Sequence, residues 1–211
     1  MVDFSLYLIT VRRQTAGRAI PAVVADALRG GLRAVQLREK DLSGSQLFEL
    51  AGELREITRN HDARLLINDR VDVVLAVGAD GVHLGKAGLP VSVARRILGP
   101  ELLIGYSAHS LEEAMQAQQD GADFVTLGPV FQTPSKAAYG EPLGVTAVAQ
   151  AARTLTIPVF ALGGVKSGSI DEILGDGIHG VALISAIIAA TNPAAETELL
   201  LQTIARHAKL S

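Results

Sequence analysis

Leu65–Leu84, LLINDRVDVVLAVGADGVHL, decides the fold, because it holds two short apolar runs separated by a segment with helical spacing. The runs Leu65–Asn68 and Gly81–Leu84 are almost wholly apolar, as strands buried on both faces should be. Two consecutive strands joined through a helix pair in parallel, because a parallel pair needs a crossover connection. The stretch therefore predicts a strand–helix–strand unit of a parallel sheet.

The same alternation of apolar runs and helical segments continues along the chain. The predicted strands are Ser5–Thr10, Ala34–Arg38, Leu65–Asn68, Gly81–Leu84, Leu102–Ser107, Phe124–Leu127, Pro158–Leu162 and Val181–Ile184. Eight such units in 211 residues favour a closed barrel. An open doubly wound sheet is the alternative, but its G-x-G-x-x-G fingerprint does not follow the first strand. We predict an α/β fold in which residues 1–211 form a single (β/α)8 TIM-barrel domain.

Helix starts are marked by a serine followed three residues later by Glu or Gln. The pairs are Ser43 with Gln46, Ser110 with Glu113, and Ser169 with Glu172. In each pair the serine hydroxyl can accept a backbone N–H, and the longer side chain can reach back to the serine N–H. The sequence therefore predicts three capping boxes.

The composition excludes several classes of protein. Apolar residues make up 48% and charged residues 19%, which excludes a disordered chain. The net charge of -3 offers no basic footprint for nucleic acid, and the lack of cysteine excludes disulfides and thiolate zinc sites. The N-terminus does not resemble a signal peptide, and no apolar run approaches the ~18 residues of a membrane span. We expect a cytoplasmic protein that binds neither nucleic acid nor membrane.

In a (β/α)8 barrel the active site lies at the carboxyl ends of the strands, so polar residues there are candidates. The second strand ends in Gln36, Arg38 and Lys40, whose alternation places them on one side. A guanidinium together with an ammonium suits a diphosphate. The alternative is an ordinary solvated strand end.

The next strand ends offer further polar groups. Asn68 and Asp69 could form a turn and helix cap, or present an amide to a base-like ring and a carboxylate to Mg²⁺. His83 lies inside a strand, where a histidine is more often structural than catalytic. Ser107 could donate to a phosphate or a departing oxygen. His109 is either an acid–base group or part of the loop packing.

The loop after the sixth strand carries two hydroxyls and a lysine, at Thr133, Ser135 and Lys136. Loops on this face of a barrel commonly carry catalytic and binding residues. Lys136 could neutralise a leaving group as a lid closes.

The last two strand ends predict a phosphate site. The paired glycines Gly163 and Gly164 let bare backbone N–H groups approach an anion, although a tight turn alone would also explain them. After the eighth strand, Ile184 and Ser185 begin a helix whose first N–H groups point outwards. Barrels of this kind often bind phosphate between these two loops.

Several segments together resemble one known family. They are VQLREKD (Val35–Asp41), LLINDRVDVVLAVGADGVHLG (Leu65–Gly85), IGYSAHSLEEA (Ile104–Ala114), GADFVTLGPVFQTPSK (Gly121–Lys136), GGV (Gly163–Val165) and GVALISAI (Gly180–Ile187). The set is similar to thiamine phosphate synthase and equally to its close relatives, the TenI-type thiazole tautomerases. Each motif alone is weak evidence for the family, but the motifs occur in the family's order and together span nearly the whole chain.

The resemblance to the synthase implies a transferase that uses Mg²⁺. It would join 4-amino-2-methyl-5-(diphosphooxymethyl)pyrimidine to a thiazole phosphate, giving thiamine phosphate and diphosphate. The implied roles are Gln36, Arg38, Lys40 and Asn68 on the pyrimidine diphosphate, Asp69 on Mg²⁺, Ser107 and Lys136 on the departing diphosphate, Thr133 and Ser135 beside the thiazole, and Gly164, Ile184 and Ser185 on its phosphate. The partners are phosphorylated small molecules, and the sequence leaves a homo-oligomer open.

Three positions depart from the synthase pattern. Gly88 stands where the family usually has a second Asp ligand for Mg²⁺, and Lys86 brings a positive charge nearby. Val11 replaces the usual Asp after Thr10. Ser135 replaces a threonine and keeps its hydroxyl.

A tautomerase and a non-catalytic phosphate-binding paralogue are the alternatives. The run Gly88–Pro90 favours the tautomerase, for which His83 and His109 are the candidate proton carriers. The histidine proposed as acid–base in some tautomerases falls near Pro129, which cannot serve. Because the residues implied for the diphosphate are intact, the synthase is the favoured prediction.

Overall fold

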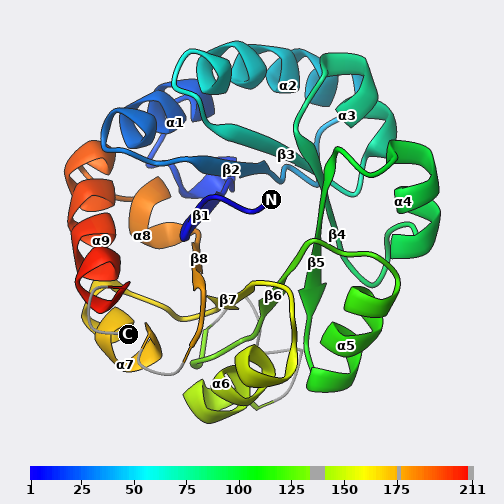
Figure 1. The fold of residues 1–211 in the computed structure, drawn as a ribbon. Coiled ribbons are helices and arrows are strands. Elements are labelled where there is room, and N and C mark those ends of the chain that lie inside the picture. The colour runs from blue at the N-terminus through cyan, green and yellow to red at the C-terminus, as the bar shows by residue number, and fades with distance from the viewer. Residues whose placement is uncertain (134–140, 175–176, 209–211) are drawn as a thin grey trace.

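The computed structural model describes residues 1–133, 141–174 and 177–208. Its centre is a closed barrel of eight parallel strands, in which β1 also pairs with β8 (Figure 1). The strands are β1 (Leu6–Ile9), β2 (Ala34–Leu37), β3 (Arg64–Asn68), β4 (Gly81–Leu84), β5 (Leu103–Ala108), β6 (Phe124–Leu127), β7 (Val159–Leu162) and β8 (Gly180–Leu183). The predicted (β/α)8 barrel is confirmed, and every predicted strand overlaps an observed one.

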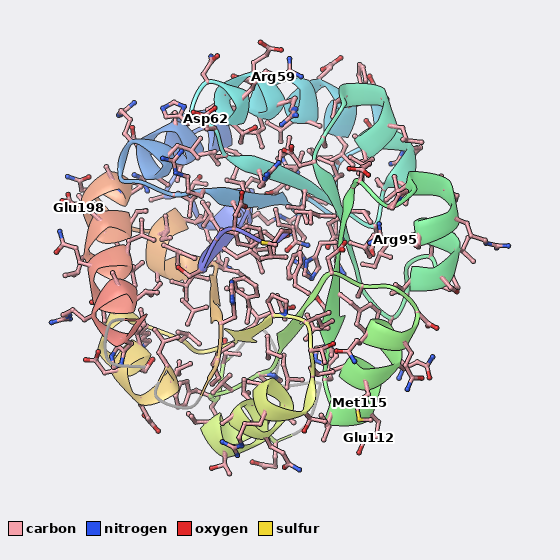
Figure 2. All side chains as sticks on the ribbon, in the orientation of Figure 1. Arg59, Asp62, Arg95, Glu112, Met115 and Glu198 are labelled. Carbon is pink, nitrogen blue, oxygen red and sulfur yellow. The ribbon has the colours of Figure 1, made fainter. Side chains whose placement is uncertain are left out.

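Helices form a ring around the barrel, and α8 lies inside that ring, between α9 and the strands (Figure 1). They are α1 (Ile20–Arg29), α2 (Gly44–Arg59), α3 (Val71–Val77), α4 (Val91–Leu98), α5 (Leu111–Gln119), α6 (Gly144–Thr154), α7 (Ile170–Ile173), α8 (Ser185–Ile188) and α9 (Pro193–Ala208), with 3-10 turns η1 (Arg12–Gln14) and η3 (Ser167–Ser169). Their outer surface is charged, as the labelled Arg59, Glu112 and Glu198 illustrate (Figure 2). Within the described part of the chain, no helix combines the length and the apolar character that crossing a membrane requires.

Aromatic rings fill the interior of the barrel. Phe4, Tyr7, Phe124 and Phe160 pack together with ring centroids between 5.3 and 6.2 Å apart. A second apolar layer lies between the strands and the helices. Because Phe4 precedes β1, the aromatic packing begins at the amino end of the barrel, and polar side chains gather at the carboxyl end.

Two Arg–Asp pairs of the same design brace the amino end of the barrel. Asp80, just before β4, accepts hydrogen bonds from Arg55 Nη1 on α2 at 2.7 Å and from the Leu65 N–H at 2.8 Å. Asp123, just before β6, accepts from Arg95 Nη2 on α4 at 2.5 Å and from the N–H of Ile104 at 2.6 Å. Figure 2 shows Arg95 at α4, on the outer side of the strands. Asp80 thus links α2 and β3 to the start of β4, and Asp123 links α4 and β5 to the start of β6.

The three predicted helix caps have three different outcomes. Ser43 and Gln46 form the expected capping box at the start of α2. Ser110 caps α5, but Glu113 accepts the N–H of His109 instead of reaching Ser110. The prediction for Ser169 is wrong: its hydroxyl bonds to the backbone of Lys166 within η3, and no side-chain cap forms at α7.

Candidate active site

A hollow of about 280 Å³ lies at the carboxyl ends of β2 and β3. Its lining comprises Leu37, Glu39, Lys40, Leu42, Leu47, Asn68, Asp69 and Arg70. The structure therefore brings together three of the residues predicted for the diphosphate and the metal, namely Lys40, Asn68 and Asp69. We call this space the β2–β3 hollow.

A chain of side-chain hydrogen bonds holds the wall of the β2–β3 hollow. Gln36 Nε2 donates to Asn68 Oδ1 at 3.1 Å, and Asn68 Nδ2 donates to Asp69 Oδ2 at 2.8 Å. The N–H of Gly85 donates to Asp69 Oδ1 at 3.0 Å. Gln36 is buried, and its Oε1 has no hydrogen-bond partner among the described residues. An orphaned buried acceptor at this place suits a ligand that carries an N–H donor.

Arg38 and Lys40 lie beyond the strand, because β2 ends at Leu37. Lys40 is exposed, whereas Arg38 is half-buried and its backbone N–H donates to Thr10 Oγ1 at 3.0 Å. The regular strand geometry on which the predicted alternation depends therefore ends at Leu37. Both positive charges nevertheless stay at the mouth of the barrel.

Ser107 lies at the mouth above a buried polar cluster. His83 Nε2 is 3.0 Å from Ser107 Oγ, and His83 Nδ1 is 3.3 Å from the Tyr7 hydroxyl. Burial, and secondarily the nearby charge of Arg38, lower the pKa of His83 to about 3. A Cβ at Gly105 would lie 2.5 Å from His83 Nδ1, so glycine leaves room for the ring. His83 is therefore buried and its imidazole is neutral, which favours the structural interpretation over that of a proton carrier.

A second and larger hollow, of about 940 Å³, lies at the ends of β6, β7 and β8. Four residues predicted for the thiazole phosphate line it, namely Thr133, Gly164, Ile184 and Ser185. Gly164 has φ +70, and a Cβ there would lie 2.7 Å from Phe131 Cβ, so the turn needs glycine. The Gly164 N–H has no hydrogen-bond partner among the described residues. We call this space the β6–β8 hollow.

Sequence reasoning missed five polar residues that line the β6–β8 hollow, namely Gln14, Gln132, Lys166, Ser167 and Ser169. Lys166 and Ser167 are separated from the paired glycines only by Val165, and a lysine two residues after Gly164 was the available signal. Ser135 and Lys136 lie outside the described residues, so their predicted roles stay predictions. His109 Nδ1 is 2.6 Å from the carbonyl oxygen of Gly128, which fits its reading as loop packing.

A family model described as "Thiamine monophosphate synthase" matches residues 6–187. The chain belongs to the thiamine monophosphate synthase family. It is 58% identical over 200 residues to a putative thiamine-phosphate synthase of Geobacter sulfurreducens, covering 95% of this chain and 94% of the relative. It is 42% identical over 187 residues to the thiamine-phosphate synthase of Clostridium novyi, covering 89% and 92%. The solved thiamine phosphate pyrophosphorylase of Pyrococcus furiosus superposes with a TM-score of 0.88 at 37% identity, covering 96% of both chains.

Gly88 lies directly beside the carboxylate of Asp69. A Cβ built on Gly88 would lie 2.5 Å from Asp69 Oδ1, so position 88 does adjoin the predicted metal ligand. Lys86 Nζ lies 3.5 Å from Glu113 Oε1, so its charge is directed to α5. No group of three or more His, Cys, Asp or Glu residues that could hold a metal occurs in the described part of the chain. Of the two carboxylates that line the β2–β3 hollow, Glu39 accepts the backbone N–H of Arg12, and Asp69 accepts hydrogen bonds from Asn68 and Gly85.

Proposed function

We propose that the protein acts as a thiamine-phosphate synthase whose two substrates occupy the β2–β3 and β6–β8 hollows. The observation that supports this assignment most strongly is the pair of polar hollows at one mouth, on opposite sides of Ser107 and His83. A reaction between two phosphorylated molecules needs two such places. The family and its curated relatives carry the same activity in their names.

The β2–β3 hollow would hold the pyrimidine diphosphate. Lys40 lines it, and Arg38 adds a second positive charge at the mouth. A guanidinium and an ammonium together suit the several oxygens of a diphosphate. The unpartnered Gln36 Oε1 fits a donor such as the amino group of the aminopyrimidine. Lys136 lies outside the described residues, and we propose that its ammonium group stabilises the departing diphosphate.

The β6–β8 hollow would hold the thiazole phosphate. The Gly164 N–H is available, and Ile184 and Ser185 begin α8. The first N–H groups of a helix have no intrahelical acceptor, so they can bind phosphate oxygens. Thr133 would contact the ring, and the missed Lys166 adds a charge beside the phosphate.

The residues present fit a single Mg²⁺. The two carboxylate oxygens of Asp69 each accept one N–H, from Gly85 and Asn68, and each retains a further lone pair. Mg²⁺ is commonly bound by one or two carboxylates plus substrate phosphates and waters. When bound, the ion would neutralise charge on the diphosphate, and Asp69 would hold it.

The chemistry then rests on positioning and on charge. The bond between the pyrimidine methylene carbon and the diphosphate oxygen breaks, the diphosphate leaves with the electron pair, and the thiazole nitrogen bonds to the methylene carbon. The protein holds the nucleophile in line and places Arg38, Lys40 and Ser107 around the departing charge. No general base is required, which agrees with a neutral, buried His83.

A coupling assay tests the proposal. Purified protein, both substrates and Mg²⁺ should give thiamine phosphate and diphosphate, followed by chromatography. Asp69→Asn should lower the rate about tenfold or more, because it removes the charge that would hold the ion. Asp62→Asn is the matched control, since Asp62 also has a positive φ (51, against 58 for Asp69) and is exposed on the outer ring (Figure 2). Absence of product from the native protein would reject the function, and equal rates in the two variants would reject the role of Asp69.

A further inference from the structure

Three polar side chains form a line through the barrel interior, from Tyr7 on β1 through His83 on β4 to Ser107 on β5. Tyr7 and His83 are both buried: Tyr7 packs against Phe4, Phe124 and Phe160, and His83 packs against Tyr7 and Phe124. Tyr7 Oη is 3.3 Å from His83 Nδ1, and His83 Nε2 is 3.0 Å from Ser107 Oγ. Distances alone leave open which atom donates at each step.

The burial of Tyr7 determines which atom donates in each of these hydrogen bonds. The only polar partner of the Tyr7 hydroxyl among the described residues is His83 Nδ1. If Nδ1 carried a hydrogen, the phenolic proton of Tyr7 would have no acceptor in an apolar cage, and an unmade buried hydrogen bond is unfavourable. Tyr7 therefore donates to a bare Nδ1. Since the imidazole must carry a hydrogen on one nitrogen, it lies on Nε2.

The hydrogen on His83 Nε2 determines how the hydroxyl of Ser107 is oriented. His83 Nε2–H donates to Ser107 Oγ at 3.0 Å, with Thr126 Oγ1 as a more distant second acceptor at 3.5 Å, and the hydroxyl of buried Thr126 donates to Ser107 Oγ at 3.4 Å. Both lone pairs of Ser107 then serve as acceptors within the protein, and its own proton is left to donate outwards at the mouth. A serine with the opposite arrangement would turn lone pairs towards any bound anion.

We propose that Tyr7 and His83 are positioning residues that hold Ser107 as a hydrogen-bond donor towards the departing diphosphate. The identity of that anion rests on the proposed function, whereas the direction of the hydrogen bonds does not. A donor oriented before the reaction needs no reorganisation as negative charge develops on the leaving oxygen. A buried tyrosine at one end of the barrel interior is thus connected to the bond that breaks at the mouth.

Nitrogen NMR of the native protein tests the direction without any assay of activity. In protein with ¹⁵N-labelled histidine, long-range ¹H–¹⁵N correlations show which ring nitrogen carries the hydrogen, and loss of a signal in His83→Gln assigns it to His83. We expect Nε2 to be protonated and Nδ1 bare. A hydrogen on Nδ1 would overturn the proposal. If the protein formed no thiamine phosphate, the proposed function would fall while this result still decided the direction.

A double-mutant cycle tests the connection to catalysis. His83→Leu should lower the single-turnover rate about tenfold or more, with little change in KM for the thiazole phosphate. In a Ser107→Ala background the same change should alter the rate less than about twofold, because the interaction it removes is already absent. His83→Gln, whose amide N–H can reach Ser107, should recover most of the rate. Equal effects of His83→Leu in both backgrounds would show that His83 acts only on folding.

Discussion

At the scale of single residues, Gly88 limits the position of the Asp69 carboxylate, the group that we propose holds Mg²⁺. A Cβ at position 88 would lie 2.5 Å from Asp69 Oδ1 and 3.2 Å from Asp69 Cγ. Any side chain there must displace the carboxylate, which now accepts the N–H of Gly85 and an N–H of Asn68. A second carboxylate cannot simply be added to the site, because the two groups compete for one space.

Two substitutions at position 88 separate displacement from ligation. Gly88→Ala moves the Asp69 carboxylate without adding a ligand, so it should raise the Mg²⁺ concentration for half-maximal rate by about tenfold, as loss of outer-shell support commonly does. Gly88→Asp moves the same carboxylate but supplies a second one, and should bring that concentration back to the native value or below. The measurement is a Mg²⁺ titration of the coupling rate. Identical titrations for native protein and Gly88→Ala would show that Asp69 does not hold the ion.

Residue types at strand ends predicted much of the site, but hydrogen-bond partners could not be predicted. Lys40, Asn68 and Asp69 do share one hollow. The bond between Gln36 and Asn68 depends on the register that sets Gln36 beside Leu66, and no local pattern encodes it. Hydrophobic periodicity also does not predict the direction of the chain after two glycines with positive φ. The position of Lys166 in the β6–β8 hollow was therefore missed.

At the scale of elements, strands were easier to predict than helix starts. β4 and β6 have the predicted bounds, because each is a short, mostly apolar segment with an aspartate directly before it and a glycine directly after it. A capping box depends on more than spacing. Ser169 has the required Glu172, but a 3-10 turn precedes α7 and takes the serine hydroxyl for the backbone of Lys166.

The confirmed box at α2 has a measurable effect on stability. The Ser43 hydroxyl accepts the N–H of Gln46 at 3.3 Å, and Gln46 Oε1 accepts the N–H of Ser43 at 3.0 Å. Ser43→Ala removes the first bond and should lower the free energy of unfolding by about 1 kcal/mol. Ser45→Ala, at an exposed position within the same helix, should leave stability unchanged or slightly higher, since alanine favours helix. Urea denaturation compares the two, and equal loss in both would contradict the cap.

At the scale of the whole molecule, the even-numbered strands repeat one pattern. The segments are Gly31–Leu37 (GLRAVQL), Gly78–Leu84 (GADGVHL), Gly121–Leu127 (GADFVTL) and Gly177–Leu183 (GIHGVAL). Each begins with a glycine of positive φ, and its valine and last leucine face the helix layer. A closed barrel makes alternate strands equivalent, because they contribute alternate layers of its interior. The repeat was visible in the sequence, but only barrel closure explains it.

The third position of two of these repeats, Asp80 and Asp123, is where the barrel is braced far from its mouth. Asp80→Asn keeps the shape but removes the charge that binds Arg55 and the N–H of Leu65. Hydrogen bonds to a charged group contribute about 1.5–3 kcal/mol, so the melting temperature should fall by about 2–4 °C for each kcal/mol lost. The coupling rate at a temperature where the variant is folded should not change, because Asp80 precedes β4 and both hollows follow strand ends.

Asp62→Asn serves again as the control for Asp80→Asn, since it removes the same charge from an exposed carboxylate with no hydrogen-bond or ion-pair partner among the described residues. Scanning calorimetry and the coupling assay on both variants give the comparison. A slower rate in folded Asp80→Asn would mean that the amino end of the barrel communicates with the mouth. An unchanged melting temperature would mean that the Arg–Asp pairs order the strand ends without contributing to stability. The expected pattern, lower stability with an unchanged rate, would place stability at one end of the barrel and chemistry at the other.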